Sequence, residues 1–288
     1  MNGEGLPSGE FFRGQFGQPA ERHEIAGSYT FDAKAVAFEN HTGDNEDAFF
    51  VDSVHPAIGV FGGEGNEIAA RIAAGATHDV LGDAPEIASP QAGCNYVHAA
   101  LVHADQKIRQ QSPNISTAGV ALKLFRDTEG QAFAAVAWVG DSRAYRLRDG
   151  ALTMLTVDHD LAAYATSVEQ ALEYQEILSS IENIEQANQL PPQLKKAFAH
   201  RYKNSNSLGG LKKEPKVSAV AYPVMPGDKY LVLTDGISDN LTSEQIEAMA
   251  GAENAPEALI TYAQVVSQRG SLRSRADDMA AATVTVGA

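Results

Sequence analysis

The sequence is poor in cysteine and in long apolar stretches, and both absences narrow the class of protein. Cys94 is the only cysteine, so an intramolecular disulfide framework is excluded and a reducing compartment is favoured. No apolar run approaches the roughly 20 residues that span a bilayer. The first residues have neither the basic start nor the apolar centre of a secretory signal. We therefore expect a cytoplasmic protein.

Positive charge is also scarce. The 288 residues include 22 Lys and Arg against 37 Asp and Glu, which gives a net charge of −15. Nucleic acids and anionic membranes are bound by clusters of Lys and Arg, and we expect the short basic pairs at 195–196 and 212–213 to be solvated surface. The charge balance disfavours nucleic acid and anionic membrane, so we expect neither as a partner. A site that handles phosphate in this chain would need metal cations to offset the repulsion.

The chain reads as one large domain behind a short tail. Residues 1–27 are rich in Gly, Pro, Ser and Gln and lack periodicity, which predicts a flexible tail. From 28 to 288 we expect a single folded domain. Short β-like runs fill 28–61, and apolar residues at helical spacing then predict helices around 68–80 and 97–108.

Strands dominate the second half of the chain. Residues 117–157 predict a β-meander with a tight Asp-Gly turn at 149–150. Residues 160–206 are more polar and helical, so we expect a flap inserted between strands rather than a separate domain. A later helix should begin after Thr242, whose spacing to Gln245 is that of a capping box. This order of elements predicts an α+β sandwich of antiparallel sheets with helices outside.

Acidic residues stand at the edges of several apolar strands, far apart in the sequence. They are Glu46, Asp47, Asp141, Asp235 and the pair Asp277–Asp278. Each alone is typical of a turn or a helix cap, but their shared position at strand ends predicts that a β core assembles them. Oxygen ligands of this kind suit hard divalent cations, and the sequence has no cluster of Cys and His for zinc. The pattern predicts a hard-cation site.

Six segments, in order, resemble the motifs of the PPM (PP2C-type) metal-dependent serine/threonine protein phosphatases. They are NEDAFFVD, GVFGGEGNEIAARIA, VGDSRAYRLRDGALTMLTVDHD, NSLGG, LVLTDGISDNLTSEQI and ADDMAAATVTV. The resemblance covers roughly residues 28–287 and implies a β-sandwich of two antiparallel sheets flanked by α-helices. Residues 160–206 fall where this family carries its variable flap.

The resemblance also implies a chemistry, in which two Mn²⁺ or Mg²⁺ ions activate a water that attacks the phosphorus of phosphoserine or phosphothreonine. Asp235 and Asp277 would bind the first ion, and Glu46 would serve the second through its waters. Asp47 would orient a metal-bound water, and Asp141 would hold a third ion with Asp235. The implied metal ligands are Glu46, Gly63, Asp141, Asp235 and Asp277, and the implied catalytic residues are Asp47 and Glu46. The partners would be phosphorylated proteins, the products of a serine/threonine kinase.

Two positions depart from the family pattern. Gly62 stands where the family has the Asp that bridges both metals, and Thr42 stands where it has a phosphate-binding Arg. Two divalent ions about 4 Å apart repel by on the order of 16 kcal/mol at an effective dielectric of about 20, and a shared carboxylate is the main local offset. Glu64, two residues on, either points to the same side as residue 62 or faces solvent.

Two functions stay open on the sequence alone. The retained carboxylates favour an active or weakly active phosphoprotein phosphatase. Gly62 and Thr42 favour a catalytically impaired pseudophosphatase that binds phosphoproteins or has a regulatory role. A single change in an otherwise competent enzyme would explain Gly62 but not Thr42.

Overall fold

The computed structural model describes residues 28–38, 45–65, 67–83, 86–210 and 214–287. The predicted tail at 1–27 and the position of Thr42 lie outside these residues. No helix in the described part of the chain is both long and apolar enough to cross a membrane.

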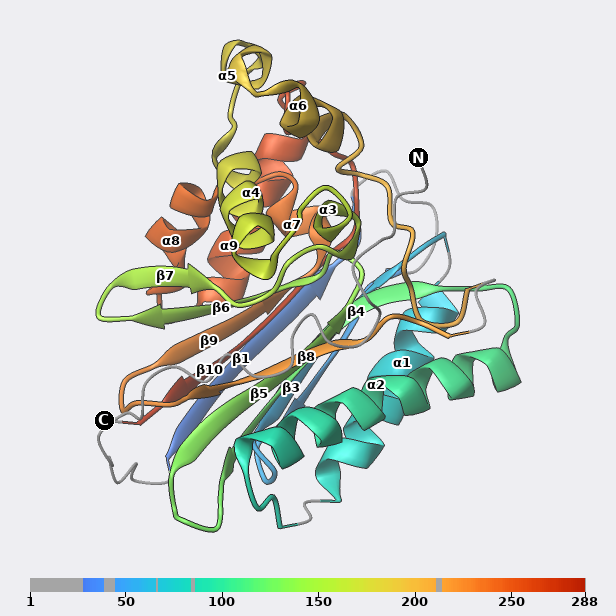
Figure 1. Cartoon of the computed structure of the whole chain (residues 1–288), viewed down its shortest axis with the longest axis vertical. Coiled ribbons are helices and arrows are strands. Elements are labelled where there is room, and N and C mark those ends of the chain that lie inside the picture. The colour runs from blue at the N-terminus through green and yellow to red at the C-terminus, as the bar shows by residue number, and fades with distance from the viewer. Residues whose placement is uncertain (1–27, 39–44, 66, 84–85, 211–213, 288) are drawn as a thin grey trace.

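Two five-stranded antiparallel sheets form the centre of the molecule (Figure 1). The first sheet has the order β1 (Tyr29–Val36), β10 (Met279–Val286), β9 (Lys229–Leu233), β6 (Arg143–Arg148) and β7 (Ala151–Met154). The second has the order β2 (Ala48–Asp52), β3 (Ala57–Gly63), β4 (Thr117–Arg126), β5 (Ala132–Val139) and β8 (Ser218–Pro223). The expected sandwich of antiparallel sheets is confirmed.

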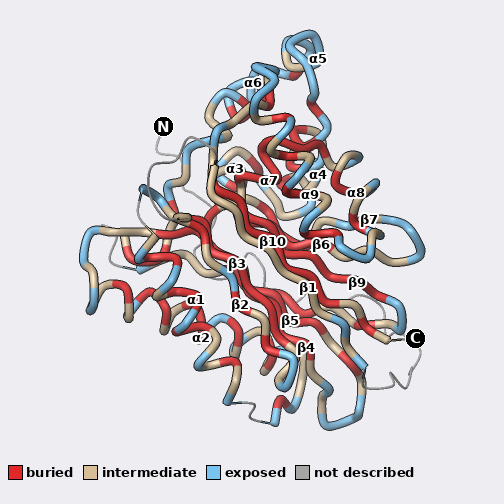
Figure 2. The backbone as a smooth tube through the Cα atoms, turned by 180° about the vertical axis from the view of Figure 1, so that it is seen from behind, coloured by how far each residue is buried: buried red, intermediate tan, exposed pale blue. Residues whose placement is uncertain are grey.

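The main core lies between the two sheets, and strand β5 shows why the sequence there is apolar throughout. Ala134, Val136 and Trp138 pack into the core between the sheets. The alternating residues Ala135, Ala137 and Val139 pack against the helices on the other face. Because neighbouring residues of a strand point to opposite faces, a strand covered on both sides loses the usual alternation of apolar and polar residues. Figure 2 shows that these central strands are largely buried.

Helices cover both outer faces of the sandwich (Figure 1). The helices α1 (Glu67–Gly82) and α2 (Pro90–Gln111) pack on the second sheet. The helices α7 (Asp235–Ser238), α8 (Ser243–Ala250) and α9 (Ala255–Ser267) pack on the first sheet. The predicted capping box is present, since Thr242 accepts a hydrogen bond from the backbone N–H of Gln245 and the Gln245 side chain accepts one in return.

Residues 160–206 form a mainly helical segment between β7 and β8. Its helices are α3 (His159–Ala162), α4 (Val168–Ser180), α5 (Ile184–Gln189) and α6 (Pro192–Ala199). They share a small apolar core of their own, which includes Leu178, Leu194 and Phe198. After α6, residues 200–206, here called the return leg, run back towards the edge of the sandwich. This leg brings polar side chains of the segment to the site described below.

The expected β-meander over 117–157 is wrong. Strands β4 and β5 form a hairpin in the second sheet, whereas β6 and β7 form a hairpin in the first. The chain crosses between the sheets at Gly140, whose φ of 89° is open to glycine and unfavourable for other residues. The predicted turn at Asp149–Gly150 is confirmed, with φ angles of 52° and 80°.

The strand register gathers the acidic residues at one end of the sandwich. Leu233 pairs with both Arg143 and Ala281, so the chain just before β6, just after β9 and just before β10 lies together. Ala48 pairs with Phe61, which brings the start of β2 beside the end of β3. These pairings place residues from five distant segments around one pocket.

Candidate functional site

A pocket of about 300 Å³ opens at this end of the sandwich. Five predicted residues line it: Glu46, Gly63, Asp141, Asp235 and Asp277. Gly62, Glu64, Tyr202, Asn204 and Arg275 complete most of the lining. The structure therefore brings the predicted metal ligands together, and their roles remain predictions.

Asp47 lies behind the pocket and is buried. Its Oδ1 accepts a hydrogen bond from the backbone N–H of Gly63 at 3.2 Å, and its Oδ2 accepts one from the Thr234 hydroxyl at 2.6 Å. Burial raises the pKa of Asp47 well above its usual value, and the charges of Asp235 and Asp277 raise it further, while the two hydrogen bonds oppose this. In this arrangement Asp47 joins the ends of β3 and β9.

Asp277 and Asp278 are adjacent in sequence but have different places. The Asp278 carboxylate accepts hydrogen bonds from the backbone N–H groups of Glu46 at 2.6 Å and Phe38 at 2.8 Å. It therefore holds the segment before β2 against the start of β10. Glu46 itself accepts a hydrogen bond from the N–H of Gly65 at 2.8 Å. Asp277, in contrast, faces the pocket.

The two glycines at the end of β3 differ in the space around them. A Cβ atom at Gly63 would lie 2.4 Å from the backbone oxygen of Glu46, so only glycine fits there. A Cβ atom at Gly62 would lie 3.4 Å from Oδ1 of Asp235 and 3.6 Å from Oδ1 of Asp47, which are ordinary contacts. A side chain at position 62 would thus enter the carboxylate cluster. The chain has none at that corner.

Glu64 does not fill the corner left by Gly62. Its Oε1 accepts a hydrogen bond from the side-chain amide of Asn204 at 3.0 Å, and its Oε2 accepts one from the Ser116 hydroxyl. Partial burial raises the pKa of Glu64, and the charge of Asp235 adds to this. Glu64 is exposed, as the solvent-facing alternative predicted, but it also lines the pocket, and its carboxylate binds Asn204 of the return leg.

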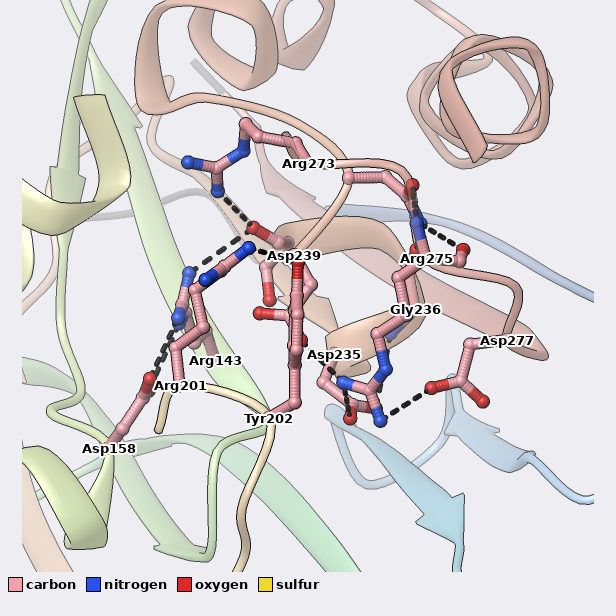
Figure 3. Close-up of polar contacts among 12 residues, drawn as sticks. Arg143, Asp158, Arg201, Tyr202, Asp235, Gly236, Asp239, Arg273, Arg275 and Asp277 are labelled. Carbon is pink, nitrogen blue, oxygen red and sulfur yellow. Dashed lines mark hydrogen bonds and ion pairs between the residues drawn. The ribbon is translucent and has the colours of Figure 1, made fainter. Parts of the chain in front are cut away.

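Arg275 occupies the middle of the carboxylate cluster (Figure 3). Its Nη1 donates to Oδ2 of Asp235 at 2.6 Å and also to Oδ2 of Asp239, and its Nη2 contacts Oδ2 of Asp277 at 2.8 Å. Neither Arg275 nor Asp239 was predicted from the sequence as a site residue. A signal was present for Arg275, because residues 275 and 277 of an extended segment point to the same side.

One guanidinium does not neutralise all of these carboxylates. Burial and the charge of Asp235 raise the pKa of Asp277 to about 7, although Arg275 opposes the shift. Burial likewise raises the pKa of Asp239. Asp141 has the least compensation for its charge. Within the described residues its carboxylate makes no hydrogen bond or ion pair, and burial raises its pKa well above the usual range. The pocket therefore has an excess of negative charge.

The all-oxygen donor set has the chemistry of a hard-cation site. In the part of the chain that the structure describes, however, no three Asp, Glu, His or Cys side chains are placed to hold one metal ion. Asp235 and Asp277 hold Arg275 instead, Glu46 is bound to a backbone N–H, and the corner at Gly62 has no side chain. The residues as they stand do not fit a two-metal centre.

No protein-family model and no curated protein matches the sequence, but solved structures resemble the fold. PppA of Pseudomonas aeruginosa, a key regulatory component of T6SS, is 20% identical with a TM-score of 0.61, over 91% of this chain and 99% of that chain. The catalytic domain of the serine/threonine phosphatase PstP, in complex with two manganese ions, is 19% identical with a TM-score of 0.60, over 90% and 99%. The S. agalactiae serine/threonine phosphatase is 20% identical with a TM-score of 0.62, over 90% and 100%.

These similarities extend over most of the chain and nearly all of each neighbour. At 20% identity or less they concern the fold. The chain has the fold of the PPM, PP2C-type serine/threonine phosphatases, as its sequence motifs implied.

Proposed function

We propose that this PP2C-fold protein is a regulatory module that binds phosphoserine or phosphothreonine proteins without hydrolysing them. The observation that carries the proposal is the corner at Gly62, where the backbone is placed for a shared carboxylate between Asp47 and Asp235 but supplies no side chain. Two divalent ions about 4 Å apart would then repel by on the order of 16 kcal/mol at an effective dielectric of about 20. Glu64 does not substitute, because Ser116 and Asn204 hold it.

Cations on the return leg support the binding of a phosphate group beside the acidic pocket. Arg201 and Lys203 line a second cavity of about 290 Å³, and Asp141 and Asn204 line both cavities. Within the described residues, neither cation forms an ion pair with a carboxylate, which is notable in a chain with a net charge of −15. Arg201 instead donates to the backbone oxygens of Phe198 and Leu272. We expect a phosphate to be held from this side.

Metal-dependent hydrolysis of phosphoserine and phosphothreonine is the second candidate function. Asp141 favours it, because a half-buried carboxylate with no partner in the described structure marks a site that is short of positive charge. The manganese ions of PstP favour it by analogy. Under this alternative Arg275 must leave before the ligands implied by the resemblance are free, namely Glu46, Gly63, Asp141, Asp235 and Asp277, for Mn²⁺ or Mg²⁺.

Peptide binding and turnover, measured side by side, separate the two functions. A fluorescent phosphothreonine peptide and its unphosphorylated twin are titrated with the protein in Mn²⁺ and in EDTA, and phosphate release is followed in the same samples. The proposal predicts selective binding of the phosphopeptide in both buffers, no Mn²⁺-dependent release, and weaker binding by Lys203→Gln. Lys195→Gln, an exposed change on α6, is the matched control.

Two results would overturn the proposal. Equal binding of both peptides removes phosphate recognition. Mn²⁺-dependent release that Asp235→Asn abolishes and Asp149→Asn leaves intact establishes the second candidate. Asp149 suits this control because it lies in the β6–β7 turn at a positive φ, which Asn also tolerates.

A further inference from the structure

Arg275 is surrounded by carboxylates at the edge of the acidic pocket. Three carboxylates meet it: Asp235 at the start of α7, Asp239 just after α7, and Asp277 just before β10. Like charges this close repel unless a cation lies between them. In the described structure the guanidinium is that cation (Figure 3). Its positive charge is the reason that Asp235 and Asp277 can share one edge of the pocket.

The other face of Arg275 meets the return leg. Its guanidinium carbon lies 5.1 Å from the centre of the Tyr202 ring, and that of Arg201 lies 4.0 Å from the same ring. Figure 3 shows Tyr202 between the two arginines. Arg201 also donates to the backbone oxygen of Leu272 at 2.8 Å, three residues before Arg275. The chain around Arg275 therefore holds the return leg at two points.

The two sets of contacts require a guanidinium in particular. A planar fork of N–H donors can bind more than one carboxylate in its plane while its face stacks on an aromatic ring. A metal ion could neutralise the carboxylates, but it would not stack on Tyr202. A lysine would supply charge without the planar geometry. The residue at 275 therefore links the charge balance of the pocket to the position of residues 200–206.

We propose that Arg275 is the built-in cation of this site and that it latches the return leg through Tyr202. A divalent cation that binds Asp235 and Asp277 then has to displace the guanidinium and release the leg. Because the two equilibria are linked, a contact that holds the return leg against Arg275 weakens metal binding by the same factor by which bound metal weakens that contact. This inference concerns the charge balance of the pocket and goes beyond the proposed function.

The test uses Mn²⁺ as the probe and two readouts that do not depend on activity. Mn²⁺ affinity is measured by calorimetry, and the exchange of the backbone amides of 200–206 is measured by hydrogen–deuterium exchange. Arg275→Gln should bind Mn²⁺ about tenfold or more tightly than the unmodified chain and should exchange these amides about tenfold faster. Arg269→Gln is the matched control, because Arg269 also lies over a tyrosine ring, that of Tyr262, on α9.

Two further variants keep the test decisive if Arg275→Gln folds poorly. Tyr202→Leu leaves the three ion pairs in place, so it should speed the exchange of 200–206 while tightening Mn²⁺ binding less than Arg275→Gln does. Arg275→Lys keeps the charge and should also loosen the leg. The proposal would be overturned if the amides of 200–206 exchanged at an unchanged rate in both Tyr202→Leu and Arg275→Lys. It would also be overturned if Mn²⁺ bound the unmodified chain as tightly as it binds Arg275→Gln.

Discussion

A side chain on Gly62 would begin 3.4 Å from Oδ1 of Asp235. Gly62 is the last residue but one of β3 in one sheet, and Asp235 follows β9 in the other. The two sheets therefore meet here with a bare backbone on one side and a carboxylate on the other. Nothing at Gly62 blocks a side chain sterically. The pocket therefore lacks a carboxylate here because residue 62 is glycine, and not because a larger side chain would fail to fit.

Gly62→Asp should lower stability without metal and restore it with metal. The new carboxylate joins Asp47 and Asp235, and two unit charges about 4 Å apart repel by up to about 4 kcal/mol at an effective dielectric of about 20. We expect a lower Tm in EDTA and a rise with Mn²⁺ that the unmodified chain lacks. Gly62→Asn adds a side chain of similar size without the charge, so it should show neither the lower Tm in EDTA nor the rise in Tm with Mn²⁺. Equal Tm values for Asp and Asn at position 62 in EDTA would contradict the electrostatic account.

Loss of the Asp278 carboxylate should lower stability more than loss of a carboxylate that binds backbone N–H groups in an exposed turn. Asp278→Ala leaves the N–H groups of Phe38 and Glu46 without their carboxylate acceptor, which we expect to cost about 2 kcal/mol or more in the free energy of unfolding. Asp127→Ala is the comparison, because Asp127 also accepts from two backbone N–H groups, but in an exposed turn. Urea unfolding measures both. A loss at Asp127 as large as that at Asp278 would show that burial is not the cause.

His159 should make the protein sensitive to acid. The ring is buried, its Nδ1 accepts from the N–H of Gly140 at 3.0 Å and from the Asn206 amide at 2.7 Å, and its Nε2 bonds the Ser218 hydroxyl at 2.8 Å. Burial, with a smaller effect of Lys216, lowers the pKa of His159 to about 3. Below about pH 6.5 the unfolded chain then binds a proton that the folded chain does not.

Stability should therefore fall as the pH drops from about 6.5 towards 3, with a contribution from this ring of up to about 1.4 kcal/mol per pH unit. His159→Gln removes the titrating group, so its free energy of unfolding should depend less steeply on pH over this range. The difference between the two proteins isolates His159 from the carboxylates that titrate in both. Parallel pH profiles would mean that the ring is protonated in the folded protein.

Gly140 should be intolerant of a side chain. Its φ is 89°, and a Cβ atom there would lie 2.7 Å from the Ala118 Cβ and 2.8 Å from the Asn204 amide nitrogen. Gly140→Ala should cost about 2 kcal/mol or more, from backbone strain together with overpacking. Gly130→Ala has a similar φ of 81° with open space around it, so it should show the strain alone, about 1 kcal/mol. Thermal unfolding of the two variants compares these losses of stability. Equal losses would mean that overpacking around Gly140 adds nothing to the backbone strain.

The sequence predicted the fold well because the signals were local. Apolar periodicity, the Asp149–Gly150 turn and the capping box at Thr242 each depend on neighbours in the chain, and each is present in the structure. The meander failed for the same reason: the pattern of 117–157 is that of four strands, but whether β6 stays beside β5 depends on the crossing at Gly140. Periodicity carries no information about which sheet a strand joins.

The sequence predicts which carboxylates gather at this end of the sandwich, but not which side chains bind them. Asp141, Asp235 and Asp277 follow from strand ends and motifs, and the structure places them on one pocket. Arg275 was missed because a residue in a loop can turn to solvent or inward, and the inward position depends on Asp235 and Asp239 from a distant segment as well as on Asp277. Glu64 depends in the same way on Ser116 and Asn204, which come from other segments.

Arg275, and not a pair of metal ions, supplies the positive charge of this pocket in the structure described here. A crystal of the unmodified chain grown in millimolar MnCl₂, with anomalous diffraction recorded for manganese, tests it directly. We predict the Arg275 guanidinium between Asp235 and Asp277 and no manganese peak within contact of either carboxylate. Two manganese peaks beside Asp235, with Arg275 turned away from the pocket, would contradict the account and restore the two-metal phosphatase.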